Sequence, residues 1–215
     1  MSNVLILSPL ALDAGDLLSS SSALNFPVGN LSNPQPKIVW KAASSGQVYV
    51  DIDLQSNQSV DSFFLGFTNA GSSVHWDIRT STSAEGRAGL ASPSNIRKPA
   101  GPILATLPEN GQRPHAFWTG PSIIARHIRM NITNSTTPFS AGVVSVGKAF
   151  RPRYNYDWGA GRSLTDLSVT KNLRGGQMDV FKDAIIPTWR FTLGNLDDGE
   201  LEALWKEEHS LAAFT

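Results

Sequence analysis

The sequence predicts a mainly β protein, an antiparallel sandwich or jelly roll, followed by a small extension of strands and one helix. Apolar and polar residues alternate with a period of two through most of the first two thirds of the chain. This alternation is typical of strands with one buried and one solvated face. Clusters of Gly, Pro, Asn and Ser separate the runs, and helical periodicity is almost absent there, which favours an antiparallel architecture.

The composition limits the classes of function. The 215 residues are 40% hydrophobic and 17% charged, enough for one large β domain or for one domain with an appendage. Basic and acidic residues number 18 each, so the chain lacks the basic stripe of a nucleic-acid binder, and its neutral charge favours association with other subunits. The absence of cysteine excludes disulfides and thiolate metal sites. No apolar run approaches the roughly 18 residues of a membrane span.

The first predicted strand lies within residues 4 to 12, which are apolar but lack the positively charged start of a signal peptide. The segment NLSNPQPKIVWKA, residues 30 to 42, follows a polar stretch. Pro34 and Pro36 keep this segment extended and hold Trp40 at a fixed place. We interpret Trp40 as a core or edge residue of the sandwich, with stacking on a ligand as the alternative.

The central strands follow from alternation over residues 48 to 54, 74 to 79 and 124 to 133. Residues 60 to 67 are apolar on both faces, as in a central strand, and residues 141 to 150 form a further candidate strand. A long stretch of small and polar residues, 81 to 101, is predicted to be a loop. The positions expected to point inward are Val48, Val50, Ile52, Leu54, Val74, Trp76, Ile78, Ile124, Ile128, Met130 and Ile132.

The composition changes near residue 150, where an aromatic and arginine-rich stretch begins. Strand-like patterns then resume, and the chain ends with a predicted helix over about 198 to 210. Asp197 and Glu200 have the spacing of a capping box at its start. We therefore assign residues 1–150 to the sandwich and residues 151–215 to a C-terminal docking extension that ends in a short helix.

The chain resembles a module common in structural proteins of tailed bacteriophages, which has a galactose-binding-like, or discoidin-like, β-sandwich. The resemblance rests on the order of the segments NLSNPQPKIVWKA, VYVDIDL, SVDSFFLGFTNAG, VHWDIRTSTS, ARHIRMNIT, SAGVVSVGKAF and RPRYNYDWG. It covers roughly residues 20 to 160. One departure is Gln55, which stands where the family usually has glycine.

The resemblance implies a virion protein of the phage tail, made in the host cytoplasm and placed in the tail tip or baseplate region. Its partners would be other tail proteins and copies of itself in a symmetric assembly. We expect no catalytic activity, cofactor, nucleic-acid binding or membrane insertion. The alternative is a carbohydrate-binding module that recognises a host surface glycan, because one fold hosts many functions.

Two segments carry candidate sites. Residues 151 to 162 have the composition of a protein interface, in which Tyr, Trp and Arg dominate, although a junction within the chain explains it equally well. Residues 111 to 122 are expected to form a loop between strands, either buried to anchor that loop or forming an aromatic platform for a sugar or a neighbouring subunit. The candidates are Arg151, Arg153, Tyr154, Tyr156, Trp158 and Arg162 in the first segment and Arg113, His115, Phe117 and Trp118 in the second.

Catalytic motifs do not stand out. Asp51 and Asp53 lie on one face of a predicted strand, where paired carboxylates more often form a polar face than an acid–base pair across a cleft. The four histidines are dispersed, and His75 and His127 are expected on solvated faces of strands.

Overall fold

The computed structural model describes residues 5–103, 113–157, 159–166, 168–172, 178–181 and 185–212. Contacts divide the chain into two compact units. One comprises Leu7–Ala149, and the other includes the chain from Phe150 onward. Each unit is described by itself.

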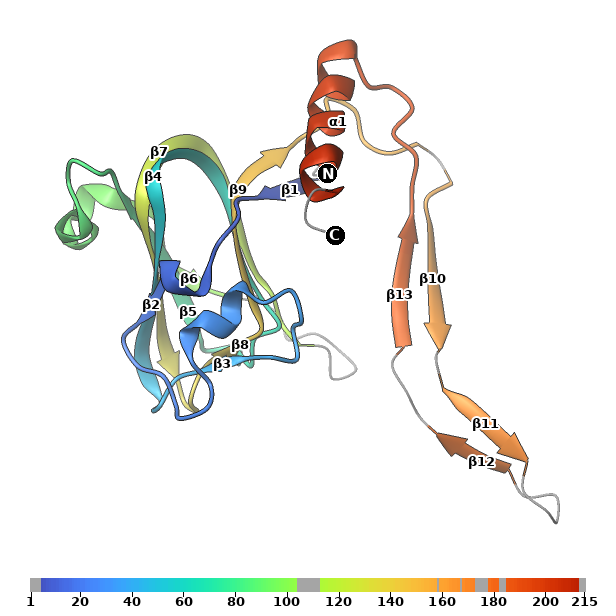
Figure 1. Cartoon of the computed structure of the whole chain (residues 1–215), viewed down its shortest axis with the longest axis horizontal. Coiled ribbons are helices and arrows are strands. Elements are labelled where there is room, and N and C mark those ends of the chain that lie inside the picture. The colour runs from blue at the N-terminus through green and yellow to red at the C-terminus, as the bar shows by residue number, and fades with distance from the viewer. Residues whose placement is uncertain are drawn as a thin grey trace. The chain divides into compact units, whose positions relative to one another are not determined.

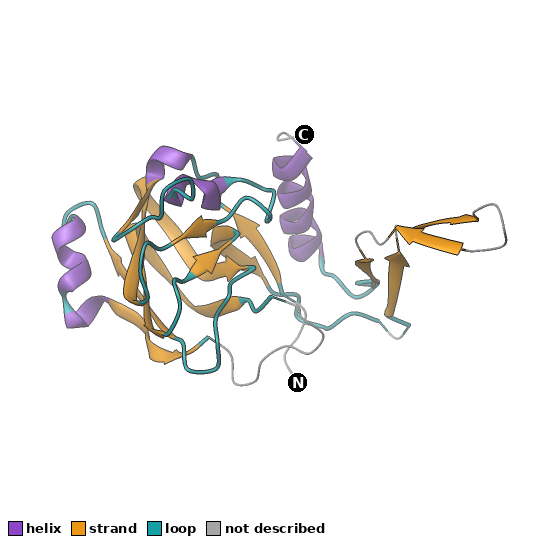
Figure 2. Ribbon diagram, turned by 90° about the horizontal axis from the view of Figure 1, so that it is seen from below, coloured by secondary structure: helices purple, strands orange, loops and turns teal. Residues whose placement is uncertain are grey.

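The first unit is an antiparallel β-sandwich whose strands follow the order β1-β9-β4-β7-β5-β6, with β2 pairing to β4 and a separate β3-β8 pair (Figure 1). Four short 3-10 helices, η1 to η4, lie between strands, and Figure 2 shows these turns at the margins of the strands. The strands are β1 (Ile6–Pro9), β2 (Leu17–Ser19), β3 (Trp40–Lys41), β4 (Gly46–Gly66), β5 (His75–Ser81), β6 (Ile96–Pro102), β7 (Ala116–Ser135), β8 (Ser140–Ala141) and β9 (Val143–Phe150). The helical turns are η1 (Ala14–Asp16), η2 (Val28–Ser32), η3 (Arg87–Ala91) and η4 (Pro93–Asn95).

Two long strands, β4 and β7, run through both layers of the sandwich. They pair with each other along most of their length, but the register shifts between Asp53 and Gln58. The pair arches over at this point in Figure 1. The part of β4 before the shift pairs with β2, and the part after it pairs with β9. One bent strand pair therefore joins the two layers.

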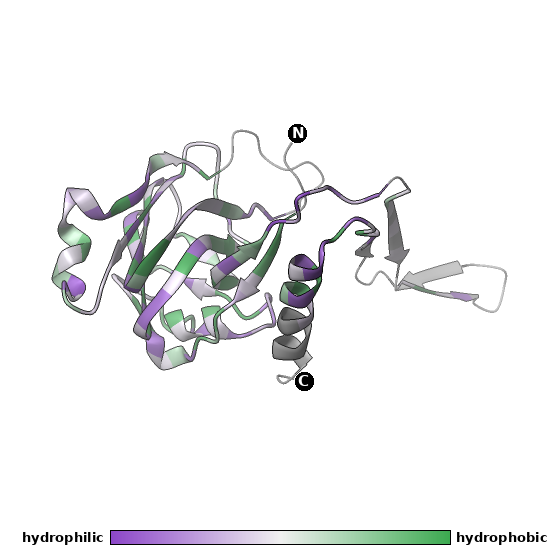
Figure 3. Cartoon of the chain, turned by 90° about the horizontal axis from the view of Figure 1, so that it is seen from above, coloured by the Kyte–Doolittle hydropathy of each residue, from purple (hydrophilic) through white to green (hydrophobic). Residues whose placement is uncertain are grey.

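The core of the sandwich follows the predicted alternation. Val50, Ile52, Trp76, Ile78, Ile128 and Met130 are all at most 1% exposed, which confirms the predicted core and the mainly β, antiparallel sandwich fold. Green and purple residues alternate along several of these strands in Figure 3. Trp40 is also fully buried, packs against Phe139 at 6.1 Å between ring centroids and donates its indole N–H to Ser22 Oγ. Trp40 is thus a core residue, as predicted.

Some sequence-based expectations were wrong in this unit. Residues 30 to 42 were expected to be extended, but η2 includes the first three of them, and the Ile38 N–H closes a turn on the Gln35 carbonyl. Ile124 was expected inside but is 55% exposed, because the bend of β7 changes the phase of alternation between buried Ala125 and buried Ile128. The predicted loop over 81 to 101 contains η3 and η4 and ends in β6, which pairs with β5. Strand β6 is short and contains Pro99, Gly101 and Pro102, so its sequence shows little alternation of apolar and polar residues. For this reason the sequence was interpreted as a loop.

The second unit contains two strand pairs and one helix. Strand β10 (Gly161–Asp166) pairs with β13 (Ile185–Arg190), and β11 (Val169–Asn172) pairs with β12 (Met178–Phe181). Helix α1 (Asp198–Ala212) begins at the predicted capping box. The Glu200 N–H donates to Asp197 Oδ1 at 2.8 Å, and the Asp197 N–H donates to Glu200 Oε2 at 3.1 Å. Among the described residues, no helix has the length and apolarity needed to cross a bilayer.

Candidate functional site

Four aromatic side chains gather where β4 ends and β7 begins. We call Phe64, Phe67, His115 and Phe117 the aromatic platform. Phe64 and Phe117 lie opposite each other in the β4–β7 ladder. The His115 ring lies 5.6 Å from the Phe64 ring and 4.9 Å from the Phe67 ring, edge-on to the latter. His115 is exposed and Phe117 is 43% exposed, so the platform reaches the solvent.

The platform is held by backbone contacts. His115 Nδ1 accepts a hydrogen bond of 3.0 Å from the Phe67 N–H, which requires a neutral acceptor nitrogen. Gly66 lies under the Phe64 ring, where a Cβ would come within 2.6 Å of a ring carbon and 2.9 Å of Val143. A glycine therefore allows the ring to lie close against the backbone at this position.

Phe67 has an unusual backbone conformation, with φ of 55°. A bulky side chain in this left-handed region carries a cost of roughly 1–2 kcal/mol. Contacts on either side fix the residue: its N–H binds His115, and its carbonyl accepts a 3.5 Å contact from the Arg113 guanidinium. The next residue, Thr68, binds the Pro114 carbonyl through both its N–H and its hydroxyl. The edge of the platform is thus a fixed turn.

The four residues predicted in this segment do not all share a face. The segment was expected to be a loop, but β7 begins at Ala116, so Phe117 and Trp118 alternate across a strand. Trp118 packs on the core, 5.6 Å from Phe63. Trp118 therefore anchors the strand, whereas Arg113, His115 and Phe117 contribute to the exposed edge. Residues 111 and 112 lie outside the described residues.

The outer face of β4, β7 and β5 carries an ion-pair network instead of the solvated face that the sequence predicts. Asp51 is only 7% exposed and binds Arg129 through two hydrogen bonds of 2.6 and 2.7 Å. The Arg129 guanidinium also lies over the Tyr49 ring at 4.1 Å. Asp77 accepts bonds from Arg79 and from Asn131. Because most of these charges have partners, the network stabilises the face and leaves little freedom for proton transfer.

Asp53 stands at the bend and contacts three cationic or titratable groups. It binds Arg126 at 2.8 Å and lies 3.8 Å from Arg87 and 3.7 Å from His127 Nδ1. The hydrogen bond from Arg126 holds the pKa of Asp53 below its usual value, although burial opposes this shift. His127 was expected to be solvated but is 7% exposed, because it faces Asp53 across the ladder next to the bend. Burial lowers the pKa of His127.

The described residues contain no group of three or more His, Cys, Asp or Glu side chains that would hold a metal ion.

The C-terminal candidates lie partly in described structure. Tyr154 and Tyr156 are 53% and 44% exposed. The Arg153 guanidinium lies 5.4 Å from the Tyr154 ring, and the Arg153 N–H donates to Glu200 Oε1 at the start of α1. Arg151 is exposed. Trp158 lies outside the described residues, as does the side chain of Arg162, whose backbone pairs with β13. The interface assignment stays a prediction.

Sequence reasoning missed Phe64 and Phe67 as members of the platform. Residues 60 to 67 are apolar on both faces, and this pattern was interpreted only as burial. The pairing of Phe64 with Phe117 depends on the β4–β7 register, which two strands so far apart in the chain do not reveal.

Comparisons with known proteins concern the sandwich. No family model matches the chain, and no curated protein matches it. Several solved structures do match the chain. The chain is similar to chitosan-binding module 1 of a chitosanase/glucanase from Paenibacillus sp. IK-5 (18% identity, 64% of this chain and 97% of that chain, TM-score 0.46). It is also similar to CBM32-3 from a family 31 glycoside hydrolase of Clostridium perfringens (18% identity, 64% of this chain and 94% of that chain, TM-score 0.47). A mutant lectin binding domain of lectinolysin, complexed with Lewis b, gives 14% identity, 66% and 99% coverage, and a TM-score of 0.48. At these identities the likeness describes the arrangement of strands alone.

Proposed function

We propose that this protein is a non-catalytic binding module that holds a glycan on its aromatic platform. The observation that carries the proposal is the exposed edge formed by Phe117 and His115 above half-buried Phe64 and Phe67. Aromatic faces contact the C–H face of a pyranose, and a few fixed polar groups beside them set orientation. Arg113 and the His115 ring supply polar groups at this edge.

The ion pairs of the other layer support the non-catalytic part of the proposal. The neighbouring carboxylates of Asp51 and Asp53 bind arginines, and the arginine bonded to Asp53 keeps the pKa of that group low. A general acid needs a raised pKa, so the lowered one argues against that role for Asp53.

The test is a glycan-array screen of the full chain, followed by calorimetry on the best hit. Phe117→Ala should weaken binding at least about fivefold, because stacking on one ring contributes on the order of 1 kcal/mol or more. Ile124→Ala is the matched control, since Ile124 is also exposed on β7 but belongs to no aromatic cluster. The proposal fails if no glycan binds or if Phe117→Ala binds as well as the native protein.

A second candidate function is a structural role in a phage tail, through contacts with other tail proteins or copies of this chain. The observation in its favour lies in the second unit. Several large apolar side chains there are exposed by 41% to 58%, namely Tyr154, Tyr156, Phe191, Leu201 and Trp205. Exposed aromatic side chains of this kind suit protein interfaces. A module of a virion that also binds a host glycan would combine both candidates.

A further inference from the structure

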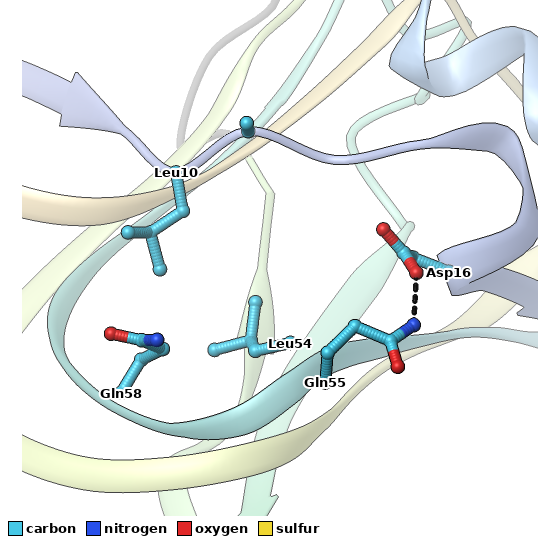
Figure 4. A pocket seen from close by; sticks show the side chains of 6 residues that line it. Leu10, Asp16, Leu54, Gln55 and Gln58 are labelled. Atoms are coloured by element: carbon cyan, nitrogen blue, oxygen red, sulfur yellow. Dashed lines mark hydrogen bonds between the residues drawn. The ribbon is translucent and has the colours of Figure 1, made fainter. Parts of the chain in front are cut away.

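A small pocket lies at the bend of β4, within the sandwich unit (Figure 4). Its volume is about 220 Å³. Three chain segments meet there: the residues after β1, the turn η1, and the bent part of β4. The lining residues are Leu10, Ala11, Asp16, Leu54, Gln55 and Gln58. No part of the aromatic platform contributes to it.

The polar groups of the pocket are oriented by local hydrogen bonds. The Gln55 amide donates to Asp16 Oδ1, as the dashed line in Figure 4 shows, and Asp16 Oδ2 accepts from the Asp13 N–H at 2.9 Å. The Gln58 amide donates to Ser56 Oγ at 2.9 Å. A primary amide has two N–H donors and two acceptor lone pairs, so each glutamine retains capacity for a ligand.

Gln55 has a backbone conformation that favours glycine, with φ of 63°. Its N–H binds Asp53 Oδ1 at 2.9 Å, which fixes this conformation. A glycine would fit the bend with less strain. What glutamine adds at this position is a side-chain amide that lines the pocket, as Figure 4 shows.

The lining chemistry selects the ligand. Among the six lining residues, the only charge is the carboxylate of Asp16, which disfavours an anion. Two contacts to donors already compensate part of that charge, which weakens its attraction for a cation. In Figure 4 the Gln55 and Gln58 amides lie on either side of Leu54, with Leu10 above them, so the pocket offers polar groups at two places and apolar groups between them. This lining matches a neutral ligand that carries both hydroxyls and C–H groups. We propose that the pocket binds one neutral sugar unit, at a site separate from the aromatic platform.

The two sites are far enough apart to act independently. Gln58 at the pocket and Phe64 at the platform are six residues apart on β4, roughly 20 Å at the rise of a strand. The pocket proposal therefore does not rest on the function proposed for the platform.

The experiment is saturation-transfer NMR on the full chain with methyl glycosides of galactose, glucose and mannose as probes. At least one neutral glycoside should bind at millimolar concentration. Gln55→Gly and Gln58→Ala should each weaken its binding about tenfold, the effect of one lost hydrogen-bonding group. Gln55→Gly relaxes the backbone but removes the bond to Asp16, whereas Gln58→Ala leaves that bond in place, so a loss in both variants reports on the pocket. Asn25→Gly is the matched control, because Asn25 has φ of 68° and is no part of the pocket.

The variants also separate this proposal from the platform. Phe117→Ala should leave binding in the pocket unchanged, and Gln55→Gly should leave binding on the platform unchanged. The pocket proposal is overturned if no neutral glycoside binds, or if the signal persists in both Gln55→Gly and Gln58→Ala. It is also overturned if glucuronate or glucosamine binds and the neutral glycosides do not, because the site would then recognise charge.

Discussion

Trp40 shows how a single side chain closes the sandwich. It follows a proline-stiffened segment, is fully buried, and its indole N–H is satisfied by Ser22. Trp40→Ala removes this packing and leaves a cavity beside Phe139, so the free energy of unfolding should fall by about 3–5 kcal/mol. Urea denaturation measures the loss. Trp40→Phe keeps most of the volume and should cost clearly less, and equal costs for the two variants would contradict the packing role.

His115 predicts a pH dependence of stability. Although His115 reaches the solvent, packing of its ring against Phe64 and Phe67 removes part of it from water and lowers its pKa below the usual 6.5. The folded protein therefore binds fewer protons than the unfolded chain just below that pH. The free energy of unfolding should therefore be highest above pH 6.5 and fall as the pH drops through the folded-state pKa. Denaturation at a series of pH values measures this slope.

A matched variant tests the assignment of that slope. His115→Gln retains an acceptor for the Phe67 N–H but does not titrate, so it should flatten the acid-side decrease. Near pH 6 the decrease that remains should belong to His127, whose pKa burial also lowers, whereas Asp53 and Glu85, whose pKa values are lowered by hydrogen bonds, contribute only at more acidic pH. An unchanged slope in His115→Gln would show that His115 does not contribute.

Alternation predicts which side chains of β4 and β7 are buried, but only away from the bend. Val50, Ile52, Ile128 and Met130 follow it because regular pairing fixes their faces. Ile124 does not, because the change of phase depends on how two distant strands bend together. His127 was wrongly expected to be solvated for a related reason. Its burial arises from neighbours across the ladder, which a single strand does not encode.

At the scale of elements, β1 depends on a glycine in β9. A Cβ at Gly147 would collide with the Ser8 carbonyl, so β9 approaches β1 too closely for any other residue. Gly147→Ala should therefore detach β1 while the rest of the sandwich persists. Hydrogen exchange of the Leu10 N–H, which donates to Val146, should lose protection. Gly71→Ala is the control, because no atom lies within 4 Å of its added Cβ. Retained protection in Gly147→Ala would refute the dependence.

The ladder between β4 and β7 depends on the Asp51–Arg129 pair. Asp51→Ala removes the hydrogen-bonded partner of a partly buried guanidinium, which keeps the Tyr49 ring and an electrostatic interaction with Asp77. The change should cost about 1–3 kcal/mol, less than for a fully buried pair, because 24% of the Arg129 side chain is exposed. Adding Arg129→Met to this variant should recover part of the loss. A double-mutant cycle by urea denaturation measures the coupling, and additive losses would show that the pair contributes nothing.

For the whole molecule, the sequence shows that the amino-acid composition changes near residue 150. Composition can be judged from one segment alone, without knowing which strands pair. It identifies Arg113, His115 and Phe117 of the proposed platform, but not their neighbours Phe64 and Phe67 and not the pocket. The platform needs the register of β4 against β7, and the pocket needs β4 to bend back towards η1. Both depend on contacts between distant segments, which local pattern does not specify.

The division into two units leads to the prediction for the whole chain. Every buried apolar residue of the core cluster lies between Leu17 and Val146, so a chain ending at Phe150 retains its complete core. The truncated chain should unfold cooperatively, stay soluble and bind glycan as the full protein does.

The segment from 151 onward contains Tyr154 and Trp205, which are 53% and 58% exposed. Removal of this segment should abolish any assembly with tail proteins or with copies of the chain. Particle incorporation and sedimentation of the two lengths measure this. A truncated chain that still assembles would place the docking surface on the sandwich, and a full-length chain that stays a monomer absent from particles would leave the glycan function alone.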